Sequence, residues 1–376
     1  MFFRVLCMLI FIGILLSSCV KVGEKSTEPV PKNLYERIIE SECAWLASIQ
    51  YENGAIPMYG RTSGTDKVCP YFSYFAVLAL LECGDQYTSN AKRYIEWHFD
   101  NLNDAEQDYN GVDGTIYDFK VTFSESGEPE LESLGSYDST DAYASTFLHT
   151  LRRYYEVTGD KNLLLENYDK INRVVNAMMS TYDDGLTWGR PDYQIKYLMD
   201  NCEVFMGMES AALLYRTVLA EKYDTTATAL ILENAAATVR ETIDSGIWNE
   251  AKGAYLPYLY ATDVDLDTFY ADATAQLWVI ICKLHEPSSE RIKTVYESFN
   301  RHFSTGEENK TWEKHEIPDP FYWASMAWAG ALMGDKDRVD EYLTIYETKH
   351  KRSTLHCGEA GFAVLAAAEM IALGDK

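Results

Sequence analysis

The feature that most constrains the fold is an alternation between two kinds of helical segment. From Leu34 onward, apolar residues recur at helical spacing, and clusters of Gly, Asn, Asp and Pro interrupt them. Segments such as 90–102 and 290–303 carry one apolar stripe among charged residues, whereas 71–80 and 362–368 are apolar on nearly every side. An amphipathic helix covers a surface and an all-apolar helix is enclosed, so we expect outer and inner helices to alternate.

The same periodicity predicts a mostly helical chain with few convincing strands. The expected helices span residues 34–50, 70–83, 89–102, 138–158, 162–180, 201–222, 225–244, 268–284, 289–303, 319–334, 336–349 and 357–373. Six solvent-facing helices that alternate with six enclosed ones are what six helical hairpins closed into a ring would produce. An open α-helical repeat solenoid is the alternative.

Local turns agree with the ring. The sequence WLASIQ at 45–50, followed by NGAIP at 53–57, looks like the first hairpin turn of many toroids, and Gly-Asp at 159–160 and 334–335 repeats a helix-ending turn. The chain therefore resembles the six-hairpin (α/α)6 toroid of carbohydrate-active enzymes. This resemblance implies an all-α fold with one toroid domain over residues 34–376. It also implies a central funnel into which residues at the N-termini of the inner helices point.

The beginning of the chain resembles an export signal. After one early positive charge, the apolar run 5–16 is too short to span a bilayer stably, and it ends in LSSC at 16–19. This ending resembles a bacterial lipobox, so we expect a signal peptide over residues 1–18, a lipid on Cys19 and a flexible tether over 19–33. The protein would then be exported and held to a bacterial membrane, at the periplasm or the cell surface, by its lipid alone.

The net charge and the cysteine pattern limit the binding partners and metal sites that we expect. Asp and Glu number 58 against 33 Lys and Arg, and the net charge of −25 repels nucleic acid and anionic lipid headgroups, so nucleic acid is not an expected partner. The cysteines beyond the signal are widely spaced and form no CxxC pair, so no zinc site is expected. We expect buried thiols, although an exported chain could oxidise one close pair. These cysteines are Cys43, Cys69, Cys83, Cys202, Cys282 and Cys357.

Carboxylates mark the starts of the expected inner helices. Asp138 and Asp141 form one pair, Asp200 and Glu203 a second, and Asp272 stands at a third junction. Acids three residues apart share a helix face, where one ionised group raises the pKa of the other and so keeps a general acid protonated near neutrality. Capping of the helix start is the alternative role for each acid. Aromatic rings beside these junctions favour a sugar site.

Hydrolysis of a glycosidic bond needs one carboxylic acid to protonate the leaving oxygen and usually a second carboxylate to activate water or attack carbon. We therefore expect a glycoside hydrolase of oligo- or polysaccharides that pairs the first acidic cluster with the second, Asp272 being the third choice. No nucleotide, dinucleotide or Gly-x-Ser-x-Gly motif is present, so no cofactor is expected. The acids at 263–267 have calcium-like spacing but lack the Gly and closing Glu of an EF-hand, so no metal is expected either.

Aromatic, basic and histidine side chains near the junctions are the candidate sugar contacts. Three rings are candidate stacking platforms, two flank the junctions, an arginine could hold a hydroxyl or carboxylate, and two histidines lie on inner helices. Surface or core packing is the alternative for each. The candidates are Trp188, Tyr193, Tyr270, Tyr137, Trp323, Arg190, His149 and His356.

Other functions fit parts of the same pattern. An unsaturated glucuronyl hydrolase would need cations for its anionic sugar, and only Arg61, Arg190 and Lys196 look available. A sugar 2-epimerase would use inner-helix histidines such as His149 to move a proton beside a carbonyl. A non-catalytic glycan-binding lipoprotein would need stacking rings but no paired acids with raised pKa values. The oligomeric state is not predicted.

Overall fold

The computed structural model describes residues 32–304, 312, 322–350 and 352–374. The chain divides into two units, Met1–Lys32 and Asn33–Lys376, and nearly all described residues belong to the second. The expected signal peptide, the lipid on Cys19 and nearly all of the expected tether lie outside the described residues and stay predictions.

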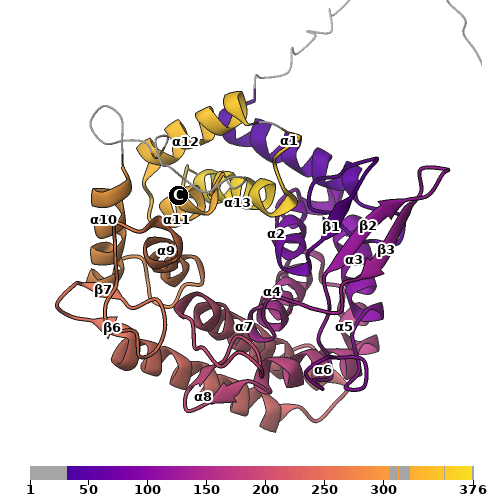
Figure 1. Cartoon of the computed structure of the whole chain (residues 1–376), viewed down its shortest axis with the longest axis horizontal. Coiled ribbons are helices and arrows are strands. Elements are labelled where there is room, and N and C mark those ends of the chain that lie inside the picture. The colour runs from indigo at the N-terminus through magenta and orange to yellow at the C-terminus, as the bar shows by residue number, and fades with distance from the viewer. Residues whose placement is uncertain (1–31, 305–311, 313–321, 351, 375–376) are drawn as a thin grey trace, which may run out of the picture. The chain divides into compact units, whose positions relative to one another are not determined.

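The helices of the second unit form two concentric rings (Figure 1). The inner helices are α2 (Pro70–Leu81), α4 (Asp141–Thr158), α7 (Leu198–Arg216), α9 (Thr274–Ile281), α11 (Ser325–Leu332) and α13 (Cys357–Gly374). The outer helices are α1 (Leu34–Ile49), α3 (Thr88–Asp100), α5 (Lys161–Glu166), α6 (Tyr168–Met179), α8 (Thr226–Thr242), α10 (Glu290–Phe303) and α12 (Lys336–Lys349). Each inner helix packs against the next, and α13 packs against α2.

This contact between the last and first inner helices closes the ring, so the predicted (α/α)6 toroid is confirmed and the open solenoid is excluded. The helix expected over 162–180 is two helices, α5 and α6, that break at Asn167. The segment expected as 268–284 begins with a π-helical turn, η4 (Phe269–Ala273), which leads into α9. The helix expected over 201–222 is α7, which ends at Arg216 and is followed by a short 3-10 turn at Leu219–Glu221. The helix expected over 319–334 is α11, which begins only at Ser325, and residues 319–321 lie outside the described part of the chain. The remaining segments agree with the expected helices to within three residues.

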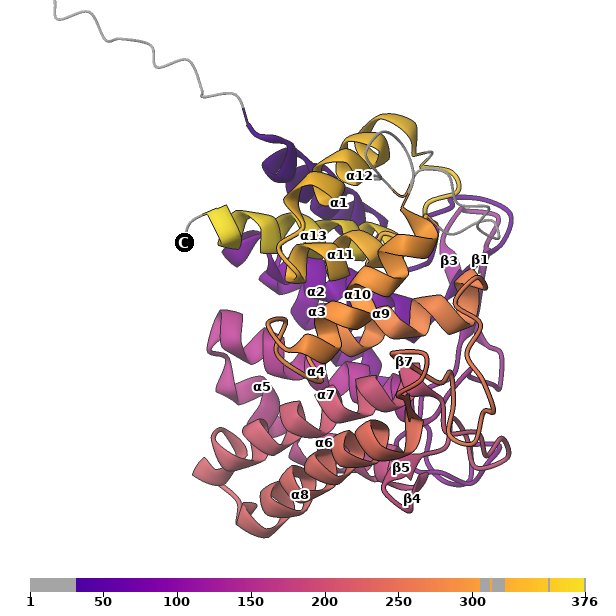
Figure 2. The ribbon, with the colours of Figure 1, turned by 90° about the vertical axis from the view of Figure 1, so that its left-hand side faces the viewer.

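Short antiparallel sheets occupy the loops that precede inner helices. The largest sheet has the order β1 (Asp66–Val68), β2 (Phe119–Phe123), β3 (Pro129–Ser133), with Phe119 paired to both Val68 and Ser133. Two hairpins are β4 (Tyr182–Asp183) with β5 (Leu186–Thr187) and β6 (Trp248–Asn249) with β7 (Ala254–Tyr255). The strands lie on one side of the ring and the C-terminus on the other (Figure 2). One face of the toroid is thus built from the loops that enter the inner helices.

The middle of the ring is filled by aromatic side chains. Phe75 of α2 contacts Phe362 of α13 with ring centroids 4.4 Å apart, and it also reaches Trp328 of α11 across the ring at 6.4 Å. Trp278 of α9 joins the same group through Phe362 at 6.3 Å. All four rings are buried. These contacts join the side chains of α2, α9, α11 and α13 in the interior of the ring.

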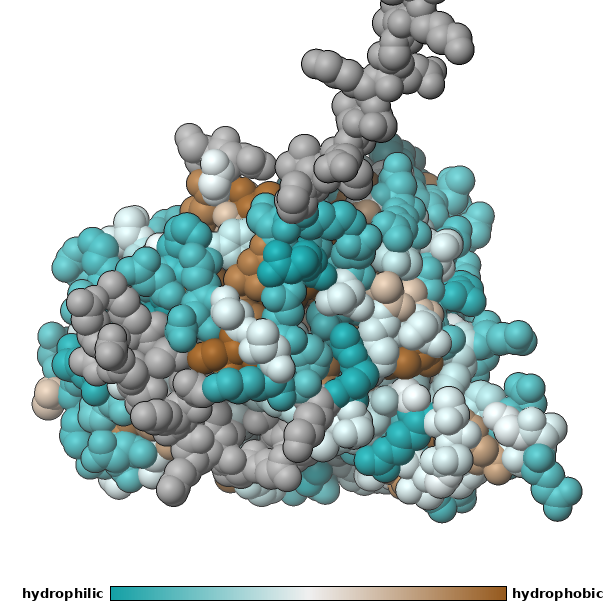
Figure 3. Space-filling view, turned by 90° about the horizontal axis from the view of Figure 1, so that it is seen from above, coloured by the Kyte–Doolittle hydropathy of each residue, from teal (hydrophilic) through white to brown (hydrophobic). Residues whose placement is uncertain are grey.

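The outside of the ring is polar, as the amphipathic outer helices require. Figure 3, which views the side that carries α1 and α12, shows a mostly hydrophilic surface with small apolar areas. Among the described residues one helix, α13, is long and apolar enough to cross a membrane, and two thirds of it is buried within the ring. It is therefore accounted for as a core helix.

A buried ion pair joins the first and last hairpins. Glu42 of α1 is only 1% exposed, and it accepts hydrogen bonds from both guanidinium amino groups of Arg352, one of them at 2.8 Å. The hydroxyl of Tyr346 on α12 donates to the same carboxylate at 3.2 Å. A buried carboxylate is tolerated only when it is paired and hydrogen-bonded, so these contacts hold the closure of the ring in one register.

The inner helices α4 and α7 approach closely at Gly207. A Cβ atom at this position would lie 2.6 Å from the Cα and Cβ atoms of Ser145 on α4, closer than carbon atoms pack. The glycine therefore sets the distance between the two helices that carry both acidic pairs.

The substitution Gly207→Ala should lower the free energy of unfolding by about 1–3 kcal/mol, because the added methyl group forces α4 and α7 apart. Gly374→Ala is the matched control, since a Cβ at the last residue of α13 meets no atom within 4 Å. Denaturant unfolding compares the two. An unfolding free energy of the Gly207 variant equal to that of the control would contradict the close approach.

Candidate active site

The two acidic pairs gather at the loop-bearing face, where the inner helices begin. Asp141 is the first residue of α4, and Asp138 precedes it in the connecting turn. Asp200 lies in the first turn of α7, and Glu203 follows one turn later. The charge of Asp138 raises the pKa values of the other three acids, and that of Asp141 raises those of Asp200 and Glu203. All four carboxyl groups therefore lie within reach of one another's field.

Burial divides these four acids into two layers. Asp141 is 0% exposed and Glu203 is 2% exposed, and we call them the inner acids. Asp138 is exposed and Asp200 is partly exposed, and we call them the outer acids. A ligand that arrives from solvent meets the outer acids first.

The inner acid Asp141 is held by a loop from the next hairpin. Thr187 of β5 donates its hydroxyl to Asp141 Oδ2 at 2.7 Å, and the amide of Ala142 donates to Oδ1 at 2.8 Å. Thr187 is fixed in turn by Asn201 of α7, whose Oδ1 accepts the Thr187 amide at 2.8 Å and whose Nδ2 donates to the Thr187 carbonyl at 3.1 Å. This chain of bonds links the starts of α4 and α7.

The inner acid Glu203 is held by side chains from two other inner helices. Tyr71 in the first turn of α2 donates its hydroxyl to Oε1 at 2.5 Å, and Trp278 of α9 donates its indole N–H to the same oxygen at 2.8 Å. Because α2 and α7 are separated by α4 in the ring, the Tyr71 bond places Glu203 near the axis of the toroid.

Burial makes the ionised form of these acids costly. It raises the pKa of Asp141 to about 7, although the hydrogen bond from Thr187 acts against the shift. Burial, with the charges of Asp141 and Asp138, raises the pKa of Glu203 to about 8 against the bonds from Tyr71 and Trp278. Burial and the charges of Asp141, Glu203 and Asp138 raise the pKa of Asp200 well above its usual range. The cluster therefore retains protons at neutral pH.

The loop 188–190 runs between the two outer acids. The amide of Thr140, next to α4, donates to the carbonyl of Gly189 at 2.6 Å. Asp200 Oδ2 lies 3.4 Å from the position that a Cβ at Gly189 would take. The guanidinium of Arg190 donates to the carbonyl of Asp138 at 3.4 Å and pairs with the carboxylate of Asp192 at 3.1 Å. The loop thus fixes the backbone at and near Asp138 and passes beside the carboxylate of Asp200, and the charge of Arg190 is directed to Asp192.

An exposed tyrosine stands over the acids. Tyr270 is 56% exposed and packs against the buried ring of Trp323 with centroids 5.3 Å apart. Burial, together with the charges of Asp138, Asp200 and Glu203, raises its pKa. Tyr270 therefore faces the cluster while much of its surface stays open to solvent, as a sugar platform requires.

Further tyrosines continue this surface away from the cluster. Tyr193 and Tyr258 are exposed, and the Tyr193 hydroxyl lies 2.9 Å from that of Tyr197. Trp188 is partly buried in the loop beside them. Tyr137, by contrast, is buried and donates its hydroxyl to Asp108 at 3.3 Å, so it supports the loop from within.

The two candidate histidines are held away from the acids by their own contacts. Nδ1 of His149 lies 3.1 Å from the hydroxyl of Ser210, deep between α4 and α7, and burial lowers its pKa to about 3. His356 is fully buried against the ring of Phe72, and burial lowers its pKa to about 3 as well. Both rings are thus neutral parts of the interior.

Asp272 and the acids at 263–267 serve the shape of their own loop. The Asp272 carboxylate accepts the amide of Asp265 at 2.8 Å. Asp265 itself accepts from the hydroxyl of Thr268 at 2.8 Å, and Asp263 pairs with Lys252 at 3.2 Å. Within the described ranges of the chain, no group of three or more His, Cys, Asp or Glu side chains is arranged to hold a metal ion.

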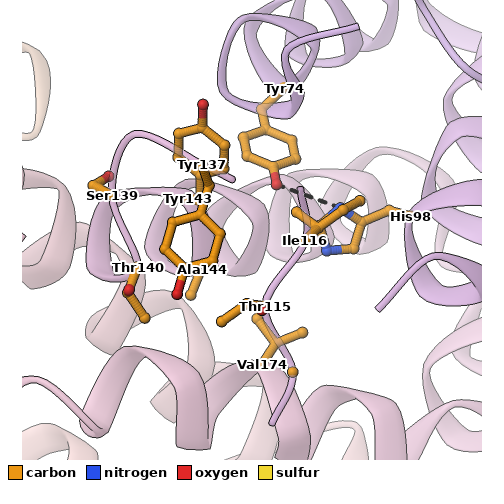
Figure 4. Close-up of a pocket in the computed structure, with 11 residues that line it drawn as sticks. Tyr74, His98, Thr115, Ile116, Tyr137, Ser139, Thr140, Tyr143, Ala144 and Val174 are labelled. Atoms are coloured by element: carbon orange, nitrogen blue, oxygen red, sulfur yellow. Dashed lines mark hydrogen bonds between the residues drawn. The ribbon is translucent and has the colours of Figure 1, made fainter. Parts of the chain in front are cut away.

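A small cavity lies next to the turn that leads into α4. It has a volume of about 10 Å³ and is lined by residues that include Tyr74, His98, Thr140 and Tyr143 (Figure 4). The Tyr74 hydroxyl lies 3.3 Å from Nδ1 of His98 at one wall. A space of this size holds roughly one water molecule, so it cannot be a sugar site.

Several residues that shape the site were not among the predicted ones. Tyr71 and Trp278 hold Glu203, while Thr187 and Asn201 position Asp141. The start of the first inner helix carries no acid and so offers no catalytic candidate, yet a tyrosine directly after the N-terminal proline of an apolar helix is a recognisable signal. Thr187 offers no comparable signal, because only the fold brings it to Asp141.

Comparison with solved structures shows the fold. A protein described as a wild-type glycosidase aligns with 90% of this chain and 97% of its own, with a TM-score of 0.65 and 13% identity. A cold-adapted family 8 xylanase aligns over 90% of this chain and 91% of its own (TM-score 0.55, 10% identity). Rex8A from Paenibacillus barcinonensis, complexed with xylose, aligns over 90% and 96% (TM-score 0.54, 11% identity). No protein-family model and no curated protein sequence matches the chain.

The raised pKa of Glu203 makes stability depend on pH. The folded protein keeps the Glu203 proton up to about pH 8, whereas the unfolded chain loses it near its ordinary value of 4.5, so stability falls as pH rises through this interval. Glu203→Gln should remove this part of the loss and be more stable than the wild type at pH 9 by on the order of 2–4 kcal/mol.

The same comparison at pH 4.5 should show a much smaller difference, because wild-type Glu203 is then protonated in the folded state. Glu209→Gln, on the exposed side of the same helix, is the matched control. Denaturant unfolding of the three proteins at both pH values measures the effect. A Glu203→Gln difference that is the same at both pH values would show that folding does not raise the pKa of this acid.

Proposed function

We propose that the protein is a glycoside hydrolase that cleaves uncharged oligo- or polysaccharides, with Asp200 as general acid and Asp138 as its partner carboxylate. The observation that carries this proposal is the meeting of a partly exposed acid of strongly raised pKa with an exposed carboxylate and an exposed tyrosine at one face of the toroid. The glycosidases among the proteins of similar fold support the same reaction class.

Asp200 has the two properties that a general acid requires. It retains its proton at neutral pH because burial and three neighbouring acids disfavour its charge. It is also partly exposed, whereas the inner acids are enclosed by protein. In the proposed reaction the Asp200 proton passes to the glycosidic oxygen as the bond from that oxygen to the anomeric carbon breaks.

Asp138 is suited to the complementary role. It is exposed, and its charge acts on Asp200 and on Tyr270, so the three groups surround one region. There Asp138 takes a proton from the water that attacks the anomeric carbon, or attacks that carbon itself before water completes the reaction. The inner acids, Asp141 and Glu203, are positioning residues: once they ionise at high pH, their charge raises the pKa of Asp200 further and so keeps its proton in place.

The substrate class follows from the rings and from the cations. Tyr270 and Tyr193 offer exposed stacking faces. The candidate cations are engaged elsewhere: Arg190 pairs with Asp192, Lys196 with Asp183, and Arg61 donates to the carbonyl of Thr65. An anionic sugar would meet acids without a dedicated counter-charge, which favours neutral sugars over the substrate of an unsaturated glucuronyl hydrolase.

Two other functions are less well supported. A sugar 2-epimerase needs a proton-transferring histidine that faces its ligand, whereas burial holds His149 and His356 neutral within the protein. A non-catalytic glycan binder has no use for buried acids, whose retention costs stability. The export signal and the lipid on Cys19 belong to the same proposal, because a lipid-anchored glycosidase would meet glycans outside the cytoplasm.

Asp200→Asn and Asp138→Asn should each lower the release of reducing sugar from a panel of neutral glycans by about 100-fold or more, because each removes a proton-transfer group. Asp184→Asn is the matched control: Asp184 is an exposed acid in the β4–β5 turn on the same face. Circular dichroism and thermal unfolding of each variant verify that the fold is intact.

The inner acids should respond differently. Asp141→Asn removes the largest neighbouring charge that raises the pKa of Asp200, so activity should persist while its decline at high pH moves to lower pH. Full activity of folded Asp200→Asn, or glycan binding by the wild type without any release of sugar, would overturn the proposal.

A further inference from the structure

We propose that Cys43 and Cys83 form a disulfide when the folded chain meets an oxidising thiol–disulfide environment, and that this bond ties α1 to the end of α2. The site lies in the first hairpin and is independent of the acids and of the proposed function.

The two thiols face each other between the helices. Each thiol contacts a backbone carbonyl in the helical turn just before the other cysteine. Cys43 Sγ lies 3.3 Å from the carbonyl oxygen of Ala79, and Cys83 Sγ lies 4.0 Å from that of Ile39. Ala79 and Ile39 each stand four residues before a member of the pair, so the contacts are reciprocal. The two thiols are also close enough to shift each other's pKa. This proximity is the first requirement for a disulfide.

One thiol of the pair can be reached by a reagent from solvent, and the other is placed to resolve the mixed disulfide that forms. Cys83 lies two residues beyond the end of α2 and is partly exposed, whereas Cys43 is fully buried on the inner side of α1. The neighbouring Cys43 thiol lowers the pKa of Cys83, and Cys83 in turn raises that of Cys43. Cys83 is therefore the thiolate that reacts first with a reagent from solvent.

The reaction balances as two successive thiol–disulfide exchanges. The Cys83 thiolate attacks one sulfur of an external disulfide, such as oxidised glutathione, and one glutathione thiolate leaves. The Cys43 thiol then loses its proton and attacks Cys83 Sγ, which expels the second part of the oxidant as a thiol. Two cysteine thiols are oxidised and one external disulfide is reduced to two thiols.

Of the described residues, the other four cysteines lack this arrangement of an exposed thiol and an adjacent thiol. Cys69 lies 3.2 Å from the hydroxyl of Tyr143 in the interior, and Cys202, Cys282 and Cys357 are buried within inner helices or at their ends. Oxidation of the folded protein should therefore be selective for one pair. The resulting bond closes the first hairpin covalently, and α1 is the outer helix that packs on α13 at the ring closure.

The test is oxidation of the purified full chain with oxidised glutathione, followed by alkylation in denaturant and tryptic mapping without reduction. We expect a cross-link between the peptide 38–61, which contains Cys43, and the peptide 68–92, which contains Cys69 and Cys83. Fragmentation should place the bond on Cys83. The oxidised protein should also melt at a higher temperature than the reduced one, because the link restricts the unfolded chain.

Two variants make the assignment specific. Cys83→Ser should lose the cross-link, whereas Cys69→Ser should keep it. If a variant does not fold, fragmentation of the wild-type peptide still distinguishes the two cysteines. Full alkylation of both Cys43 and Cys83 after oxidation, a bond on Cys69, or stable glutathione adducts in place of the cross-link would each overturn the proposal.

Discussion

The closed ring of parallel inner helices is the constraint on which the rest of the structure depends. The six inner helices are parallel, so they start at one face of the toroid, and the contact of α13 with α2 closes them into a ring. The residues that begin these helices are therefore brought together at that face. Asp141 and Asp200 are far apart in sequence, yet the charge of Asp141 raises the pKa of Asp200 because the two acids begin neighbouring inner helices. The buried pair of Glu42 and Arg352 supports this closure from the outer ring.

The buried acids of the site cost the folded protein stability. Two enclosed carboxyl groups, Asp141 and Glu203, avoid the cost of buried charge by keeping protons that exposed acids would lose. Their hydrogen bonds from Thr187, Tyr71 and Trp278 hold them in place without making ionisation favourable. In the proposed mechanism these protonated acids surround the proton donor Asp200, and this role would account for acids in an otherwise apolar interior.

Much of the architecture could be predicted from the alternation of amphipathic and apolar segments, because that pattern reports burial directly. The strands could not, since β3 reads PELES and has little apolar alternation to announce it. The junction acids were recognisable because the resemblance to a toroid directs attention to the starts of the inner helices. Their division into outer and inner acids was not, because it depends on Thr187 and Tyr71, which reach the acids from distant segments. Asp272 also stands at the start of an inner helix, so the sequence marks it in the same way. Its carboxylate, however, accepts a hydrogen bond from the Asp265 amide within its own loop.

The most direct test of this account is an NMR titration of the side-chain carboxyl carbons in protein labelled with ¹³C at aspartate and glutamate, with Asp141, Asp200 and Glu203 assigned through single substitutions. The account predicts that these three carboxyl groups titrate near or above neutral pH, with Asp141 at about 7 and Glu203 at about 8. Titration of all three in the ordinary acidic range would show that they do not share a buried site, and the proposed proton donor would be lost with it.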